Sequence, residues 1–147
     1  MPKIWDAGKA EDLLRRMERL RPDTKAAWGK FTPARMIAHC ADAMRAGLGD
    51  FPVAAKWTPF RTRPMQKLVI YLMPWPKGAP TAPELLQDGE PDFEQAKRDL
   101  RVALGRFVAA GAKGKFADHA AFGKLSGEDW GALAHRHLEH HWKQFGL

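Results

Sequence analysis

Apolar residues recur at intervals of three and four in four stretches of the chain, and no stretch shows the sustained alternation that is typical of strands. This pattern predicts an all-α fold. The first predicted helix follows Asp6 as its N-cap and runs to about Leu20. The second has a clear start, with Thr32 as the cap and Pro33 in the first helical position, and it ends at Gly47.

Two further helices are predicted in the second half of the chain. One runs from near Pro91 to just before Gly111 and carries apolar residues at helical spacing along its whole length. The other begins at Ser126, whose hydroxyl can cap it, and runs to about Phe145. Glu128 and Asp129, in its first turn, favour the positive end of the helix dipole.

The segment 51–83 separates the second and third helices and contains seven of the eleven prolines but no acidic residue. Pro64 can start a short helix through Tyr71, which Pro74 would stop. Basic and aromatic side chains are interleaved here: Lys56, Trp57, Phe60, Arg61, Arg63, Lys67, Tyr71, Trp75 and Lys77. We interpret the segment as a crossover that packs over one end of a helical bundle. The alternative is a basic, aromatic surface for an anionic substrate or a membrane lipid.

The 147 residues suit a single domain, 1–147, and their 45% hydrophobic content suits one helical core. The longest nearly uncharged apolar run, 68–76, is far below the ~20 residues that a bilayer span requires. Residues 1–9 lack the apolar block of a signal peptide, so we expect a cytoplasmic protein with no membrane span. The net charge of +7 would attract anions, but no zinc-finger, RNP or basic-zipper pattern supports nucleic-acid binding.

Histidine is the residue type that carries the candidate chemistry. Six occur, four of them in the last predicted helix, at positions 39, 119, 135, 137, 140 and 141. A helical wheel places His137 and His141 on the same apolar face as Leu138 and Phe145, one turn apart. Two imidazoles at this spacing can chelate one metal ion. The alternative is a pair of hydrogen-bonded core histidines, and the apolar flanks favour the metal.

Two known metal architectures do not fit this pattern. A zincin requires Glu directly after the first histidine, whereas Glu139 projects from the opposite side of the helix. Di-iron carboxylate bundles require Glu three residues before each ligating histidine, and Ala134 and Met36 occupy those positions.

A third ligand must come from elsewhere in the chain, and the candidates are His39 and His119. His39 lies in a predicted helix, and this rigid position favours it over His119 in a loop. Asp42 follows His39 by three residues and can ligate or orient the imidazole. Cys40, the only cysteine, cannot form an intrachain disulfide, and its rotation of ~100° from His39 predicts a core position.

Three runs of sequence together resemble the DinB/YfiT-like superfamily. They are Trp-Gly-Lys-Phe-Thr-Pro-Ala-Arg-Met-Ile-Ala-His-Cys-Ala-Asp at 28–42, Pro-Trp-Pro-Lys-Gly at 74–78 and His-Leu-Glu-His-His-Trp-Lys-Gln at 137–144. More narrowly, the second run and Phe-Gly-Lys-Leu-Ser at 122–126 are similar to an uncharacterised branch of that superfamily. The resemblance covers nearly the whole chain.

This resemblance implies a four-helix bundle of up-down-down-up topology that holds a divalent metal, often nickel or zinc, through three histidines. Carried over by position, the ligands are His39, His137 and His141, and Gln144 matches the trailing Gln of the family pattern. The superfamily includes thiol-dependent S-transferases and a mycothiol-dependent isomerase, but the branch has no established reaction. The long basic crossover departs from those relatives.

We therefore expect a metal-dependent enzyme, a hydrolase or a thiol S-transferase, whose three histidines leave a coordination position open. Its substrate would be a small molecule that is anionic or contains a thiol, and Asp42 and His119 are candidate proton carriers. The alternative is a non-catalytic, metal-stabilised module that binds an anionic partner. A homodimer is an expectation from the resemblance alone.

Overall fold

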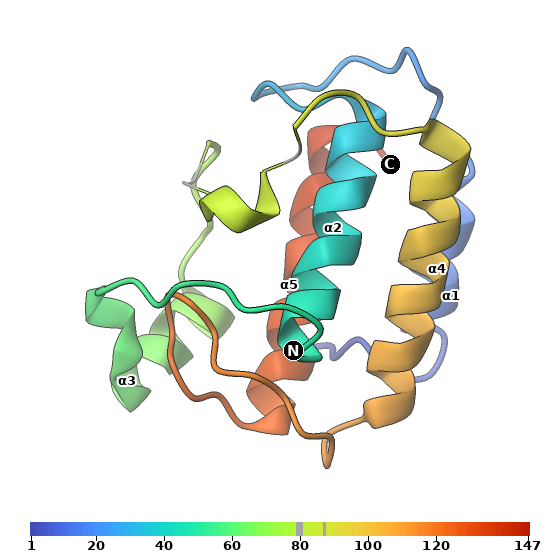
Figure 1. The fold of residues 1–147 in the computed structure, drawn as a ribbon. Coiled ribbons are helices and arrows are strands. Elements are labelled where there is room, and N and C mark those ends of the chain that lie inside the picture. Colours follow the sequence, from blue (N-terminus) through green and yellow to red (C-terminus); the bar gives the residue numbers. More distant parts are fainter. Residues whose placement is uncertain (79–80, 87) are drawn as a thin grey trace.

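The computed structural model describes residues 1–78, 81–86 and 88–147, and it is built from helices and loops (Figure 1). The α-helices are α1 (Lys9–Met17), α2 (Pro33–Gly47), α3 (Arg63–Lys67), α4 (Phe93–Ala110) and α5 (Gly127–Gln144). Shorter turns are the 3-10 helices η1 (Pro59–Arg61) and η3 (Pro83–Leu85) and the π-helix η2 (Leu68–Leu72). Within the described residues there is no strand, and one isolated bridge joins His119 to Gly123. The all-α prediction is confirmed.

Side-chain caps start two of the helices where the sequence predicts them. The Thr32 hydroxyl accepts a hydrogen bond from the Arg35 amide at 3.2 Å, and α2 ends at Gly47. The Ser126 hydroxyl accepts from the Asp129 amide at 3.1 Å and begins α5. Each cap satisfies an amide that would otherwise lack a partner in the first turn.

The start and end of α1 differ from the prediction. Gly8 precedes the helix with φ of 76°, and no side chain caps it. The Asp6 carboxylate instead accepts from the Lys3 amide at 2.8 Å, so it closes a turn before the helix. The helix ends at Met17, and Leu20 is buried in the loop that follows.

The four longer helices enclose the core. In Figure 1, α2 lies beside α4, with α5 behind α2 and α1 behind α4. The start of α2 and the end of α5 lie toward the same end of the view, so the two helices are antiparallel. Large side chains that are fully buried between them are Leu13, Met17, Met36, Ile37, Leu100, Leu104, Phe107, Leu138 and Trp142. The Trp142 indole N–H donates to the Leu13 carbonyl at 3.0 Å, which joins α5 to α1. Cys40 is fully buried, as predicted.

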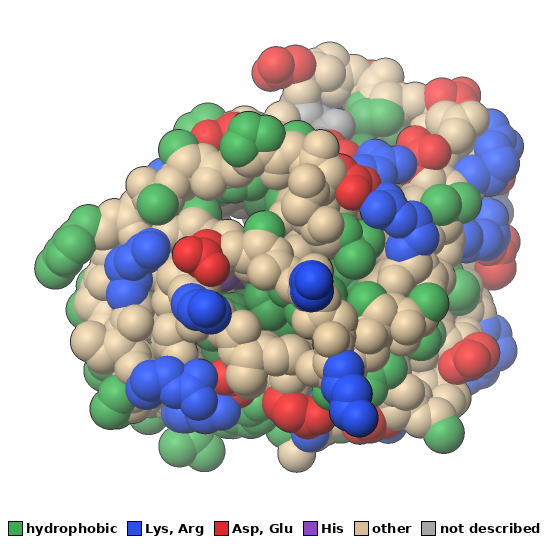
Figure 2. Space-filling view, turned by 60° about the horizontal axis from the view of Figure 1, so that its bottom comes forward, with side chains coloured by type: hydrophobic (Ala, Val, Ile, Leu, Met, Phe, Trp, Pro, Cys, Tyr) green, Lys and Arg blue, Asp and Glu red, His purple; other side chains and the backbone are tan. Residues whose placement is uncertain are grey.

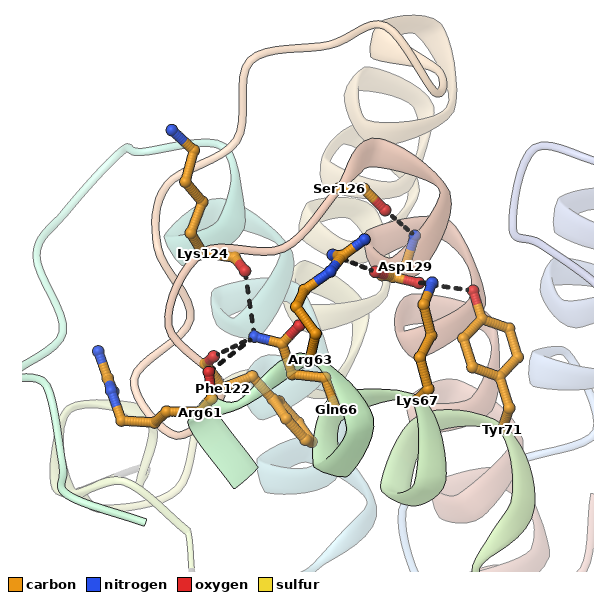
Figure 3. Close-up of polar contacts among 9 residues, drawn as sticks. All are labelled: Arg61, Arg63, Gln66, Lys67, Tyr71, Phe122, Lys124, Ser126 and Asp129. Carbon is orange, nitrogen blue, oxygen red and sulfur yellow. Dashed lines mark hydrogen bonds and ion pairs between the residues drawn. The ribbon is translucent and has the colours of Figure 1, made fainter. Parts of the chain in front are cut away.

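The crossover begins its contact with α5 at a buried carboxylate. Asp129 has no exposed side-chain surface, and it accepts hydrogen bonds from Lys67 at 2.5 Å and Tyr71 at 2.8 Å (Figure 3). Arg63 lies 3.4 Å away. Burial raises the pKa of Asp129, but the hydrogen bonds from Lys67 and Tyr71 outweigh it and hold this pKa below its usual value. Two cations of the predicted basic surface thus neutralise an internal charge.

Further contacts hold the crossover along the side of α5. Arg136 donates to the carbonyls of Val69 at 2.9 Å and Ile70 at 2.7 Å, and its guanidinium stacks on Trp75 at 4.8 Å. The Gln66 amide donates to the Phe122 carbonyl at 2.7 Å (Figure 3). The crossover thus contacts α5 from its first turn, at Asp129, to the middle of the helix, at Arg136.

The surface of the crossover mixes apolar and basic side chains. Trp57 is 87% exposed and Leu72 is 76% exposed. Figure 2 shows Lys and Arg side chains at several separate places on this face, between hydrophobic ones. No described helix is both long enough and apolar enough to cross a bilayer.

Candidate metal centre

Three histidines from two antiparallel helices converge on one point. The Nε2 atom of His39, on α2, lies 3.0 Å from the Nε2 atom of His137, on α5. The Nε2 atom of His141 lies 3.1 Å from the same His137 nitrogen. Among the described residues, these three form the group whose ligand atoms lie close enough to hold one metal ion. The structure thus brings together the three ligands predicted from the sequence.

The imidazole rings face each other edge to face. Ring centroids are 4.7 to 5.0 Å apart, and the ring planes are 75° to 82° from one another. Each ring therefore directs one nitrogen toward the shared centre while its faces pack elsewhere. Two nitrogen ligands that share an ion at ~2.0–2.1 Å must lie roughly 3–4 Å apart, and the observed separations are at the short end of this range.

The outer nitrogens of two of these rings already have partners. The Nδ1 atom of His39 lies 3.0 Å from the Leu85 carbonyl oxygen in η3. The Nδ1 atom of His141 lies 2.7 Å from Oε1 of Gln144, one turn further along α5. The Gln144 Nε2 atom donates to the Trp28 carbonyl at 2.9 Å, so its amide orientation leaves Oε1 for the histidine. Both partners are acceptors, and both Nδ1 atoms must therefore carry the proton.

The three facing nitrogens share at most one proton. Because neutral His39 and His141 hold their single ring proton on Nδ1, their Nε2 atoms present lone pairs to His137. The Nε2 atom of His137 can contribute at most one proton to two acceptors at 3.0 and 3.1 Å. A cation at the centre would accept all three lone pairs, and carbonyl groups that fix the outer nitrogens are the usual support of metal-binding histidines.

The protonation of the cluster also suits a metal. Burial, together with the charge that His39 would carry, lowers the pKa of His141 to about 3. Burial likewise lowers the pKa of His39 and, with the neighbouring histidines, places that of His137 well below its usual value. The neutral imidazole is the form that ligates metals, so these rings are ready to bind at neutral pH.

The cluster is enclosed on one side. His39 and His141 are buried, and the Phe31 ring packs 5.2 Å from the first and 5.9 Å from the second. His137 is intermediate in exposure. The position of Phe31 before the Thr32 cap gives no periodic signal in the sequence.

Asp42 lies close to His39 on α2 but turns away from the three nitrogens. Its carboxylate pairs with Arg45 at 2.9 Å and lines a hollow of about 220 Å³ between α2 and α4. Its charge raises the pKa of His39, yet less than burial lowers it. The structure therefore places Asp42 beside the cluster and outside the group of ligand atoms.

His119 also lies outside that group. Its Nδ1 atom accepts from the amides of Ala121 at 3.0 Å and Phe122 at 3.3 Å, which leaves the ring proton on Nε2. Its ring packs 5.5 Å from that of Trp130. Burial lowers the pKa of His119 to about 4, helped by the Arg61 charge. These contacts are those of a histidine that orders its own loop.

The groups that orient the three histidines have weaker sequence signals than the histidines themselves. Gln144 matched a family pattern, but its bond to His141 was not anticipated, although a spacing of three residues on one helix face could have indicated it. The Leu85 carbonyl has no side-chain signature at all.

The chain belongs to the DUF1569 family, described as proteins of unknown function, whose sequence profile matches residues 6–146. No curated protein and no solved structure matches the chain. Any function must therefore be argued from the geometry of the three histidines and their surroundings.

Proposed function

We propose that His39, His137 and His141 bind one divalent cation, nickel or zinc, and that the protein is a metal-dependent enzyme. The supporting observation is the convergence of three Nε2 atoms while the outer nitrogens of His39 and His141 donate to fixed acceptors. Three protein ligands are the number that catalytic zinc sites use, with a further position left for a reactant.

The chemistry of such a centre is that of a Lewis acid. A bound divalent cation there would activate a water for hydrolysis or a thiol for transfer to an electrophile. The residues of this chain supply the rest: His39 and His141 stay oriented by Leu85 and Gln144, and Phe31 excludes water from the buried side. His119 and Asp42 are the proton carriers of this proposal, because the charge of Asp42 acts on His39 and that of His119 acts on His137.

The link to the DinB/YfiT-like superfamily is part of this proposal. In that interpretation α1, α2, α4 and α5 are the four helices of an up-down-down-up bundle, and α3 with its flanking turns is an elaboration of the crossover. The resemblance favours a small substrate that contains a thiol or is anionic. Homodimer formation and a cytoplasmic location stay predictions, and sedimentation analysis would test the first.

Elemental analysis of protein prepared without a histidine tag tests metal binding. We expect about one metal ion per chain, lost in His137→Ala and His141→Ala and retained in His135→Ala, which removes an imidazole from a different face of α5. Circular dichroism of each variant would show whether the fold is intact. Full metal retention by both ligand variants would refute the site.

A second candidate function is a non-catalytic, metal-stabilised module. The enclosure of His39 and His141 by Phe31 favours it. Cobalt-loaded protein separates the two functions. An enzyme of the proposed kind gains a thiolate-to-metal absorption band when a thiol is added, or hydrolyses an activated ester, whereas a sealed module does neither.

A further inference from the structure

A hollow of about 300 Å³ lies beside α5, on the helix face next to that of the three histidines. Two indoles form its apolar walls: Trp28 from the loop before α2, and Trp75 from the crossover. The His140 ring is near both indoles, 5.6 Å from that of Trp28 and 5.9 Å from that of Trp75. The hollow has the volume of a small ligand site and combines aromatic walls with a few polar groups.

The walls of this hollow are held in place by α5 itself. The Gln144 side chain donates to the Trp28 carbonyl at 2.9 Å, and the backbone carbonyl of Gln144 accepts from the Ala27 amide at 2.8 Å. On the other side, Arg136 stacks on Trp75 and donates to carbonyls of the π-helix η2. The Trp75 indole N–H also donates to the Val69 carbonyl at 3.0 Å. Hydrogen bonds within the chain thus hold the Trp75 indole and the backbone at Trp28.

The hollow carries more positive than negative charge. Lys77, Arg136 and Lys143 line it, and within the described residues no ion pair joins any of them to a carboxylate. The one acidic residue in the lining, Glu139, is already bound by the Arg16 guanidinium from α1. Arg136 donates to backbone carbonyls through its terminal nitrogens. The ammonium groups of Lys77 and Lys143 are therefore the cations of this lining that are best placed to bind an anion.

The distribution of these groups defines the chemistry of the ligand. The Lys77 ammonium group lies 5.0 Å from the centre of the Trp28 ring, so this cation lies against an aromatic wall of the hollow. The His140 ring is 5.2 Å from that of His141, which puts the hollow one side chain away from the three-histidine cluster. A ligand here needs one anionic group and one flat or apolar body.

We propose that this hollow binds a small organic anion, a carboxylate or a phosphate ester, with its apolar part between Trp28 and Trp75 and its charge on Lys77 and Lys143. The inference names the substrate class of the proposed metal site and rests on that site for its catalytic meaning. Binding of the anion itself is measured without metal, so the two proposals can fail separately.

The test uses fluorine NMR of the whole, metal-free protein with 4-fluorophenyl phosphate and with 4-fluorobenzoate. We expect saturable broadening of the fluorine signal with at least one of these anions, and the pair shows whether phosphate or carboxylate is preferred. The neutral 4-fluorobenzamide should bind at least about tenfold more weakly, because it has no negative charge to pair with Lys77 and Lys143. Equal binding of the amide and both anions would overturn the proposal.

Variants locate the site. The double variant Lys77→Gln/Lys143→Gln should weaken anion binding by about tenfold or more, since two charged hydrogen-bond donors are removed. The matched control is Lys113→Gln/Lys115→Gln, which makes the same change of net charge at two exposed lysines in the loop after α4. An equal loss in both double variants would show nonspecific attraction and overturn the site, as would unchanged binding in the first.

Cobalt then relates the hollow to the metal site. In cobalt-loaded protein the bound anion should show additional paramagnetic broadening, which His137→Ala abolishes while anion binding persists. If no metal binds but the metal-free protein still binds the anion through Lys77 and Lys143, the hollow stands and the metal proposal falls. If the anion binds only to metal-loaded protein and ignores the lysines, the metal holds it and the hollow is refuted.

Discussion

Two buried polar clusters lie on the same helix, α5, and they differ in how their charges and protons are balanced. Near the start of the helix, the Asp129 carboxylate receives donors from Lys67 and Tyr71, so its negative charge is matched within the chain (Figure 3). Near the end, His137 faces His39 and His141 with at most one proton between three nitrogens. The first cluster is complete, and the second is a group of three histidines that could hold a metal ion.

The difference shows which buried polar groups indicate function. A buried group that finds all its partners inside the protein serves the fold, and its removal costs stability. A buried group whose lone pairs meet other lone pairs has an unmet requirement that a ligand can fill. The contrast therefore predicts that perturbing one cluster changes stability alone, whereas perturbing the other changes metal binding.

The largest expected effect is metal-dependent stabilisation through the histidine cluster. Nickel or zinc at about a thousand times its dissociation constant should stabilise the wild-type chain by about 4 kcal/mol, or roughly 10 °C in melting temperature. His137→Ala should show no such shift, because both close nitrogen–nitrogen contacts of the cluster involve this residue. Differential scanning calorimetry with metal and with chelator measures it.

His135→Ala is the control for that experiment, since His135 lies on α5 outside the three-histidine group. It should keep the full metal-induced shift. An equal shift in His137→Ala and the wild-type chain would mean that metal stabilises the protein through some other site.

The second effect belongs to the complete cluster. Asp129→Ala should lower the free energy of unfolding by about 1–3 kcal/mol, because it removes a buried acceptor from Lys67 and Tyr71. The loss stays in this range because the side chains of Lys67 and Arg63 are about half exposed and regain water. Guanidinium denaturation measures it, with Asp118→Ala, an exposed loop carboxylate, as the matched control.

Metal stoichiometry should be unchanged in Asp129→Ala if the two clusters are independent. Loss of metal in proportion to lost stability would show that the clusters are energetically coupled through α5, and that Asp129 affects more than stability.

A third, smaller effect concerns the support of one ligand. Gln144→Ala removes the acceptor of the His141 Nδ1 proton and should weaken metal affinity by about tenfold or more. Gln144→Glu keeps an acceptor oxygen at the same place and should bind metal at least as well as the wild type. Competition with a coloured chelator measures both, and equal affinity of Gln144→Ala and the wild type would remove Gln144 from the site.

Local signals in the sequence were sufficient for much of this arrangement. The Thr32–Pro33 and Ser126 starts set the register of α2 and α5, and this register determines which residues share a face with His39 and His137. The spacing of His137 and His141 then predicts two ligands without knowledge of the fold. These features are local because they depend on a few consecutive residues.

The remainder depends on contacts between distant parts of the chain. The path of the crossover along α5 is set by Asp129 and Arg136, whose partners lie about 60 residues earlier. Nothing in the pattern of 51–83 distinguishes a lysine that pairs with a buried carboxylate from one on a solvated surface. The Leu85 carbonyl that orients His39 is a backbone group, and backbone partners leave no trace in residue types.

The smallest effect tests the charge balance of the complete cluster directly, through the pH dependence of Asp129→Asn. Lys67 and Tyr71 hold the pKa of Asp129 below its usual value despite burial, so the folded state binds its proton less readily than the unfolded chain does. The stability that this charge contributes is therefore fully present above pH ~4 and is lost as the pH falls through the folded value. The difference in unfolding free energy between the wild type and Asp129→Asn should be constant between about pH 5 and 7 and should shrink on further acidification, while the remaining carboxyl groups titrate in both proteins and cancel. A difference that grows toward low pH would mean that burial outweighs the cationic partners, and Asp129 would then be an incompletely matched group like the histidines at the other end of the helix.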